Sequence, residues 1–154
     1  MSIFELFQGV FSGKGSGQYP TIEPFEYLET LSFISDGRPF IRLEQKTKKT
    51  DRVTPLHQEV GYIRVLEGSE LELVLVQPTG VVEVAKGIYS EEDASATMEF
   101  RSIQVIATPS AKPVAETLRT YRLASETLTF EFHMAAAQQE TQFHLRSDLV
   151  REEA

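Results

Sequence analysis

The stretch from Gly9 to Pro20 carries glycines at alternate positions, Gly13, Gly15 and Gly17. If this stretch is a β-strand, one of its faces has no side chains, because alternate residues of a strand point to the same side. Glycines inside strands mark bulges, bends or a close approach of other atoms to the backbone. The pattern therefore predicts a first strand that bends at the corner of a barrel, with other atoms packed against its bare face.

A phosphate-binding loop is the alternative interpretation of these glycines. Both nucleotide-binding fingerprints require a buried strand before the glycines and a helix after them. Here the glycines lie inside the predicted strand, and Pro20 and Pro24 follow it. The pattern therefore favours the bent strand over a nucleotide site.

The composition limits the class of protein. The chain has 154 residues, enough for a single domain over 1–154 with a real core, and no cysteine, which excludes disulfides and thiolate chemistry. The first eight residues carry Glu5 and lack the basic start of a signal peptide, and no apolar run is long enough to span a membrane. The net charge of -8 disfavours a phosphate backbone as partner. We expect a soluble cytoplasmic protein that binds neither nucleic acid nor membranes.

Short alternating segments separated by turn residues follow the whole chain. Ser2 and Glu5 form a capping-box pattern for one helical turn over 2–7. Strands are expected at 9–19, 25–33, 39–46, 56–66, 69–77, 81–89, 97–107, 114–124, 127–136 and 141–150, with an acidic loop at 91–95. This order predicts an all-β fold, a closed antiparallel up-and-down barrel of about ten strands with a short N-terminal helical turn near one end. A barrel of this size leaves room for a small ligand.

The three histidines differ in their predicted orientation. His133 alternates with apolar neighbours, which predicts an outward side chain. His57, at the start of a strand, is as consistent with a structural role as with a ligand contact. Alternation places His144 on the face of the strand opposite to that of Phe143 and Leu145. Three explanations stay open: this face looks into a polar barrel mouth, the strand is bulged, or the residue binds no ligand.

The glycine stretch resembles the signature of the nitrobindin family, G-x-W-x-G-x-G-x-G-x-Y-P. Further segments resemble the family in the same order between Leu6 and Arg151. Two positions depart from the family: Phe11 stands where the signature has tryptophan, and Gln77 stands where a histidine is expected in many members. Phenylalanine keeps the apolar bulk at that corner and removes the indole donor. The signature positions matched here are Gly9, Gly13, Gly15, Gly17, Tyr19 and Pro20, and the further segments are 21–25, 55–64, 78–80, 134–136 and 144–145.

The resemblance implies a lipocalin- or fatty-acid-binding-protein-like barrel that holds haem b with ferric iron, binds nitric oxide and isomerises peroxynitrite to nitrate. It implies that His144 is the iron ligand and catalytic residue, and that His57, Thr21, Met134 and Arg119 contact the haem. The expected partners are these small molecules, in a monomer or homodimer. The alternative is a haem-free carrier of a fatty acid or another small apolar ligand, in which His144 is incidental.

Overall fold

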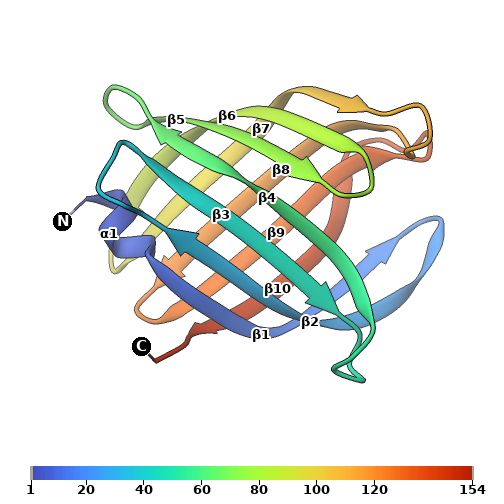
Figure 1. Cartoon of the computed structure of the whole chain (residues 1–154), viewed down its shortest axis with the longest axis horizontal. Helices are drawn as coiled ribbons and strands as arrows, with labels where there is room; N and C mark the ends of the chain where they lie inside the picture. The colour runs from blue at the N-terminus through green and yellow to red at the C-terminus, as the bar shows by residue number, and fades with distance from the viewer. Residues whose placement is uncertain (1, 154) are drawn as a thin grey trace.

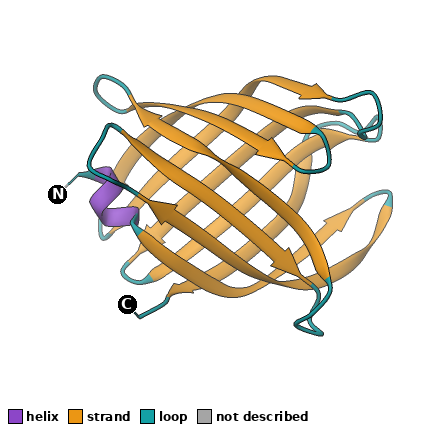
Figure 2. Ribbon diagram, in the orientation of Figure 1, coloured by secondary structure: helices purple, strands orange, loops and turns teal. Residues whose placement is uncertain are grey.

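The structure is a computed structural model that describes residues 2–153 and contains one short helix and ten strands (Figures 1 and 2). The elements are α1 (Ile3–Phe7), β1 (Gly9–Tyr19), β2 (Ile22–Ile34), β3 (Phe40–Lys48), β4 (Pro55–Val65), β5 (Glu70–Gln77), β6 (Val81–Glu92), β7 (Ser95–Ala107), β8 (Val114–Ala124), β9 (Thr127–Ala136) and β10 (Gln142–Arg151).

Each strand pairs antiparallel with the next one in the chain, and β1 also pairs with β10, which closes the barrel. The predicted fold class is therefore confirmed. The predicted acidic loop at 91–95 is wrong, because Glu91 pairs with Ala96 and Glu92 with Ser95 at the tip of the β6–β7 hairpin. The acidic side chains at this tip are exposed. The charge of these side chains correctly indicates that they are exposed, but it does not prevent the backbones of β6 and β7 from pairing.

The helix α1 lies at one end of the barrel (Figure 2). Its capping box is present: the Ser2 hydroxyl accepts a hydrogen bond from the Glu5 amide at 3.2 Å, and the Glu5 carboxylate accepts one from the Ser2 amide at 2.8 Å. Phe4 and Phe7 are buried, so the turn covers the end of the barrel with aromatic side chains. Within residues 2–153, the structure contains no helix of the length and hydropathy needed to cross a membrane.

Aromatic side chains fill the interior next to α1. The ring of Phe33 meets those of Phe7, Phe11 and Tyr121 edge to face, at centroid distances of 5.7, 6.3 and 5.8 Å. Such pairs are favoured by the charge distribution of the rings. Phe11, where the family signature has tryptophan, is fully buried and has the Arg151 guanidinium 4.7 Å from its ring centroid. Phenylalanine therefore packs fully at this corner.

The bare face of β1 is covered by side chains of the neighbouring strand. In the β1–β2 pairing Gly15 lies opposite Tyr27, and Gly17 opposite Phe25. A Cβ atom on Gly15 would come within 2.3 Å of the Tyr27 ring, and one on Gly17 within 2.4 Å of the Phe25 ring. The predicted close approach is thus confirmed, and Figure 1 shows β1 bending along its length. The absence of side chains at Gly15 and Gly17 therefore leaves space for the rings of Tyr27 and Phe25.

Candidate functional site

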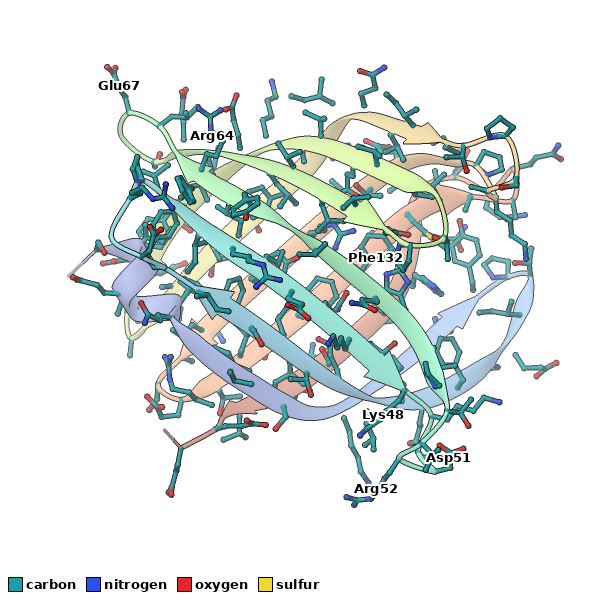
Figure 3. All side chains as sticks on the ribbon, viewed as in Figure 1. Lys48, Asp51, Arg52, Arg64, Glu67 and Phe132 are labelled. Carbon is teal, nitrogen blue, oxygen red and sulfur yellow. The ribbon has the colours of Figure 1, made fainter. Side chains whose placement is uncertain are left out.

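A cavity of about 320 Å³ lies inside the barrel. Its apolar walls include Phe25, Phe132, Met134 and Leu145. Figure 3 shows Phe132 within the barrel, whereas the side chains of Arg64 and Glu67 point outward. Polar residues from β3, β4, β6, β8 and β10 also reach the cavity: Gln45, Thr47, His57, Glu59, Glu83, Thr117, Arg119 and His144.

A β-bulge turns His144 toward the cavity. In the β10–β9 pairing Phe143 lies opposite His133 and Leu145 lies opposite Phe132, so His144 is an extra residue without a partner. Bulges re-aim a side chain in this way. Leu145 and His144 consequently both line the cavity although they are neighbours in sequence. Of the three possibilities that alternation left open for His144, the bulged strand is the one present.

The His144 ring is fixed by one of its nitrogens. Nδ1 lies 2.9 Å from the carbonyl oxygen of Gln18, to which it donates a hydrogen bond. The rings of Tyr19 and Phe25 meet it at centroid distances of 5.3 and 6.3 Å. Burial lowers the pKa of His144, against the opposing effect of the Gln18 carbonyl. The neutral ring therefore carries its lone pair on Nε2, which has no hydrogen-bond partner within residues 2–153.

His57 lies on the inward face of β4 and also lines the cavity. Its Nε2 is 3.2 Å from the Glu59 carboxylate, and its side chain is 32% exposed, so this part of the cavity communicates with solvent. The Gln77 side chain donates a hydrogen bond to the same carboxylate at 3.5 Å. The glutamine thus supports Glu59 from the neighbouring strand β5.

A buried cluster of charges lies beside His57. Arg119 donates to Glu59 at 2.5 and 3.2 Å and to Glu83 at 2.7 and 3.1 Å. All three side chains are at most 2% exposed. Burial alone would lower the pKa of Arg119, but the two carboxylates hold it well above its usual value. The guanidinium also lies 4.7 Å from the ring centroid of Phe132, which joins the charged cluster to the apolar wall.

A second buried carboxyl group, that of Glu29, lies on the inward face of β2. One of its oxygens accepts a hydrogen bond from the Ser147 hydroxyl at 3.1 Å, and the other has no partner within residues 2–153. Burial raises the pKa of Glu29 to about 7. The hydroxyls of Tyr27, Thr117 and Tyr121 are likewise buried without partners in the described chain. Polar groups of this kind inside proteins usually bind ordered water.

The predicted site residues are partly brought together. His57, Met134, Arg119 and His144 line one cavity. Thr21 is exposed in the turn between β1 and β2 and is not among the lining residues. The outward orientation predicted for His133 matches its position on the outer wall of the barrel.

Sequence reasoning missed the buried carboxylates. His57, Glu59 and Ile63 alternate on one face of β4, a signal that could have placed Glu59 inside. For Glu83 the pattern is ambiguous, because apolar residues lie on both faces of the segment: Val81 and Ala85 face inward with Glu83, whereas Val82 and Val84 face outward, 38% and 36% exposed. Arg119 makes the inward position of Glu83 possible, because it pairs with Glu83 inside the barrel.

The donor chemistry of the cavity fits a haem group. A neutral imidazole with one nitrogen bonded to a backbone carbonyl and the other free is the usual protein ligand of haem iron. The surrounding Phe25, Phe132, Met134 and Leu145 offer apolar walls to a flat macrocycle. The opening beside His57 leaves a path to solvent.

Comparison with known proteins agrees with this geometry. The model of the THAP4-like, heme-binding beta-barrel domain matches residues 3–151. Peroxynitrite isomerase 2 of Mycobacterium ulcerans is 41% identical over 143 residues, which cover 93% of this chain and 89% of the relative. Peroxynitrite isomerase 1 of Mycolicibacterium paratuberculosis is 40% identical over 144 residues, covering 94% and 89%. The crystal structure of Rv2717c from M. tuberculosis superimposes with a TM-score of 0.91 at 36% identity, covering 96% of this chain and 93% of that one. The chain therefore belongs to the family of THAP4-like, haem-binding β-barrel domains, the nitrobindin family.

Proposed function

We propose that the protein binds ferric haem b through His144 and isomerises peroxynitrite to nitrate, and that it also binds nitric oxide. The observation that carries the proposal is the bulge in β10, which brings His144 into the cavity with Nδ1 bonded to Gln18 and Nε2 free. Relatives that share 37–41% of their residues with this chain over nearly its whole length are named peroxynitrite isomerases.

Each part of the cavity has a separate task in this function. When bound, the haem supplies a Lewis-acidic iron that promotes the rearrangement of peroxynitrite. His144 would hold that group, while Met134, Phe132 and Leu145 would exclude water from the cavity. Exclusion of water would strengthen the electrostatic interactions of bound peroxynitrite and limit side reactions. Thr21, in the exposed β1–β2 turn, is proposed to contact the haem edge outside the cavity.

The buried charges weigh against the alternative of a fatty-acid carrier. A carboxylate head group needs a cation with free donors, and Arg119 is the one buried cation within residues 2–153. Its guanidinium already donates to both Glu59 and Glu83. A fatty acid entering the cavity would meet these two carboxylates, which repel it.

The cellular setting proposed here is the cytoplasm, where a chain without cysteine needs no oxidising environment. The proposed working unit is a single domain over 1–154, as a monomer or homodimer that takes small molecules as partners.

Titration with haem tests this function. The wild type should develop a Soret band, and the ferric complex should accelerate peroxynitrite decay with nitrate as the product. His144→Ala should lose the axial bond and the activity. His57→Ala should keep the axial bond and alter only the fit or the reactivity. His133→Ala is the matched control, because that histidine lies on the outer wall, and it should behave as the wild type.

Two results would overturn the proposal. One is a wild-type protein that takes up no haem. The other is a His144→Ala variant that binds haem and reacts as the wild type does. Either result would favour the alternative, a haem-free carrier of a fatty acid or another small apolar ligand.

A further inference from the structure

His57 is held at two points, and one of its ring nitrogens stays free. Its backbone amide donates to the Thr47 hydroxyl at 3.0 Å, and its ring Nε2 lies 3.2 Å from the Glu59 carboxylate. Nδ1 has no hydrogen-bond partner within residues 2–153. The ring is thus fixed at the edge of the cavity with Nδ1 available to a bound molecule.

The protonation state of Glu59 decides which nitrogen of His57 carries the proton. Burial would raise the pKa of Glu59, but the charge of Arg119 and the hydrogen bond from His57 outweigh burial and lower it to about 2. Glu59 is therefore ionised at neutral pH and can only accept hydrogen bonds. It follows that Nε2 of His57 bears a proton and that Nδ1 of the neutral ring bears a lone pair.

We propose, building on the peroxynitrite chemistry above, that Glu59 is a positioning residue that holds His57 as the proton acceptor for peroxynitrous acid. The O–H bond of the acid breaks, an N–H bond forms at Nδ1, and the products are the peroxynitrite anion and an imidazolium. No electrons are transferred. Glu59 keeps its bond to Nε2 throughout and stabilises the positive ring, as a carboxylate does in an acid–imidazole pair.

The charges around His57 favour this role. Glu59 contacts the ring from the same strand, β4, and is itself paired with Arg119 on β8. Arg119 is shared with Glu83 on β6, and Glu29 on β2 interacts with His57 through its charge. On the remaining side His144 of β10 is kept neutral by burial. The group that faces Nε2 of His57 is thus a carboxylate that Arg119 holds in place.

Glu83 offers a control variant that separates the positioning of His57 from the structural role of the ion pairs with Arg119. Like Glu59, it is a buried glutamate that makes two hydrogen bonds to Arg119. Unlike Glu59, it makes no hydrogen bond to His57 within the described chain. Glu59→Gln and Glu83→Gln therefore remove comparable partners of Arg119, and only the first changes the group that faces His57.

The first measurement is nitrogen-15 NMR of the histidine rings in haem-free protein at mildly alkaline pH. In the wild type and in Glu83→Gln, His57 should have its proton on Nε2. In Glu59→Gln the single amide oxygen is drawn to Arg119, so the amide N–H₂ faces the ring and the proton should move to Nδ1. A wild-type ring with its proton on Nδ1 would overturn the proposal even if the variant fails to fold. A tautomer unchanged in Glu59→Gln would also overturn it.

The second measurement is peroxynitrite decay on the ferric, haem-loaded variants as a function of pH. Loss of a positioned proton acceptor should slow Glu59→Gln by on the order of 10²-fold where peroxynitrous acid is the main form, with a smaller loss for Glu83→Gln. Equal losses in the two variants, both with a normal Soret band, would reject the positioning role and leave the haem function intact. Failure of the haem function itself shows separately, as a wild type without a Soret band.

Discussion

The two halves of the barrel interior differ in chemistry although the same strands build both. Along the inward face of β2, Phe33 and Leu31 give way to Glu29 and Tyr27. On β8, Tyr121 is followed toward the cavity by Arg119. The half next to α1 is a core of aromatic and aliphatic side chains, and the other half holds buried charges and two of the histidines, His57 and His144. Apolar packing is therefore concentrated at one end of the interior, and polar and titratable groups at the other.

The largest loss of stability should follow from a change in the aromatic half. Phe33→Ala removes a fully buried ring that contacts Phe7, Phe11 and Tyr121. We expect the free energy of unfolding to fall by about 3–5 kcal/mol. Urea denaturation measures the change, with Val53→Ala, at a residue that is 79% exposed, as the control. A loss no larger than that of the control would show that this half is not the main source of stability.

A comparable or slightly smaller loss should follow from Arg119→Met in the polar half. Both Glu59 and Glu83 would be left as buried carboxylates without a cation. Breaking a buried ion pair in this way costs about 3–5 kcal/mol. The control is Arg64→Met, since Arg64 pairs with Glu72 at 56% and 38% exposure and should contribute at most about 1 kcal/mol. If both substitutions cost the same, the buried cluster contributes no more than a surface pair.

Glu29 should make the polar half sensitive to pH. Its pKa is raised from 4.5 to about 7 by burial, so the native state binds a proton more tightly than the unfolded chain does. The stability present below pH 4.5 should therefore be lost as pH rises through 7, by about 3 kcal/mol in total. Glu29→Gln should lack this slope. Denaturation of both proteins at about pH 5 and about pH 8 tests the difference; parallel curves would contradict a buried neutral carboxyl group.

The smallest effect on stability should come from His144→Ala in haem-free protein. The half-buried ring makes one hydrogen bond to a carbonyl and several aromatic contacts. We expect a loss of about 1 kcal/mol, well below that of Phe33→Ala, although this substitution should abolish the function. Thermal unfolding without haem gives the comparison. A loss as large as that of Phe33→Ala would mean that the bulge supports the whole barrel.

The fold was predictable because its determinants are local. Alternation and turn residues located all ten strands, and Gly37 and Gly68, with φ values of +92° and +64°, lie in the short gaps between predicted strands. The Gly15 pattern indicated a close approach to β1, which Tyr27 makes. These features depend on neighbours in sequence or on the next strand.

The site was predictable only in part because its determinants lie far apart in the chain. Residues 59, 83 and 119 meet only after the barrel closes, and a charged residue in an alternating strand ordinarily faces water. Glu83 and Arg119 each enter the interior because the other is there. The resemblance to the nitrobindin family pointed to His144 and Arg119, whereas Glu29 and Glu59 carried no motif that marked them as buried.

The extra residue in β10 makes the position of the proposed iron ligand depend on residue number as well as residue type. In a regular strand, the residue before inward-facing Leu145 would point out of the barrel. His144 faces inward because two residues of β10 span the place of one on β9. Deletion of a single residue from this strand, such as Gln142, would allow the regular register to form. The imidazole of His144 would then point out of the barrel, although the residue itself is unchanged. In this barrel, short deletions near the C-terminus threaten function more directly than many substitutions do.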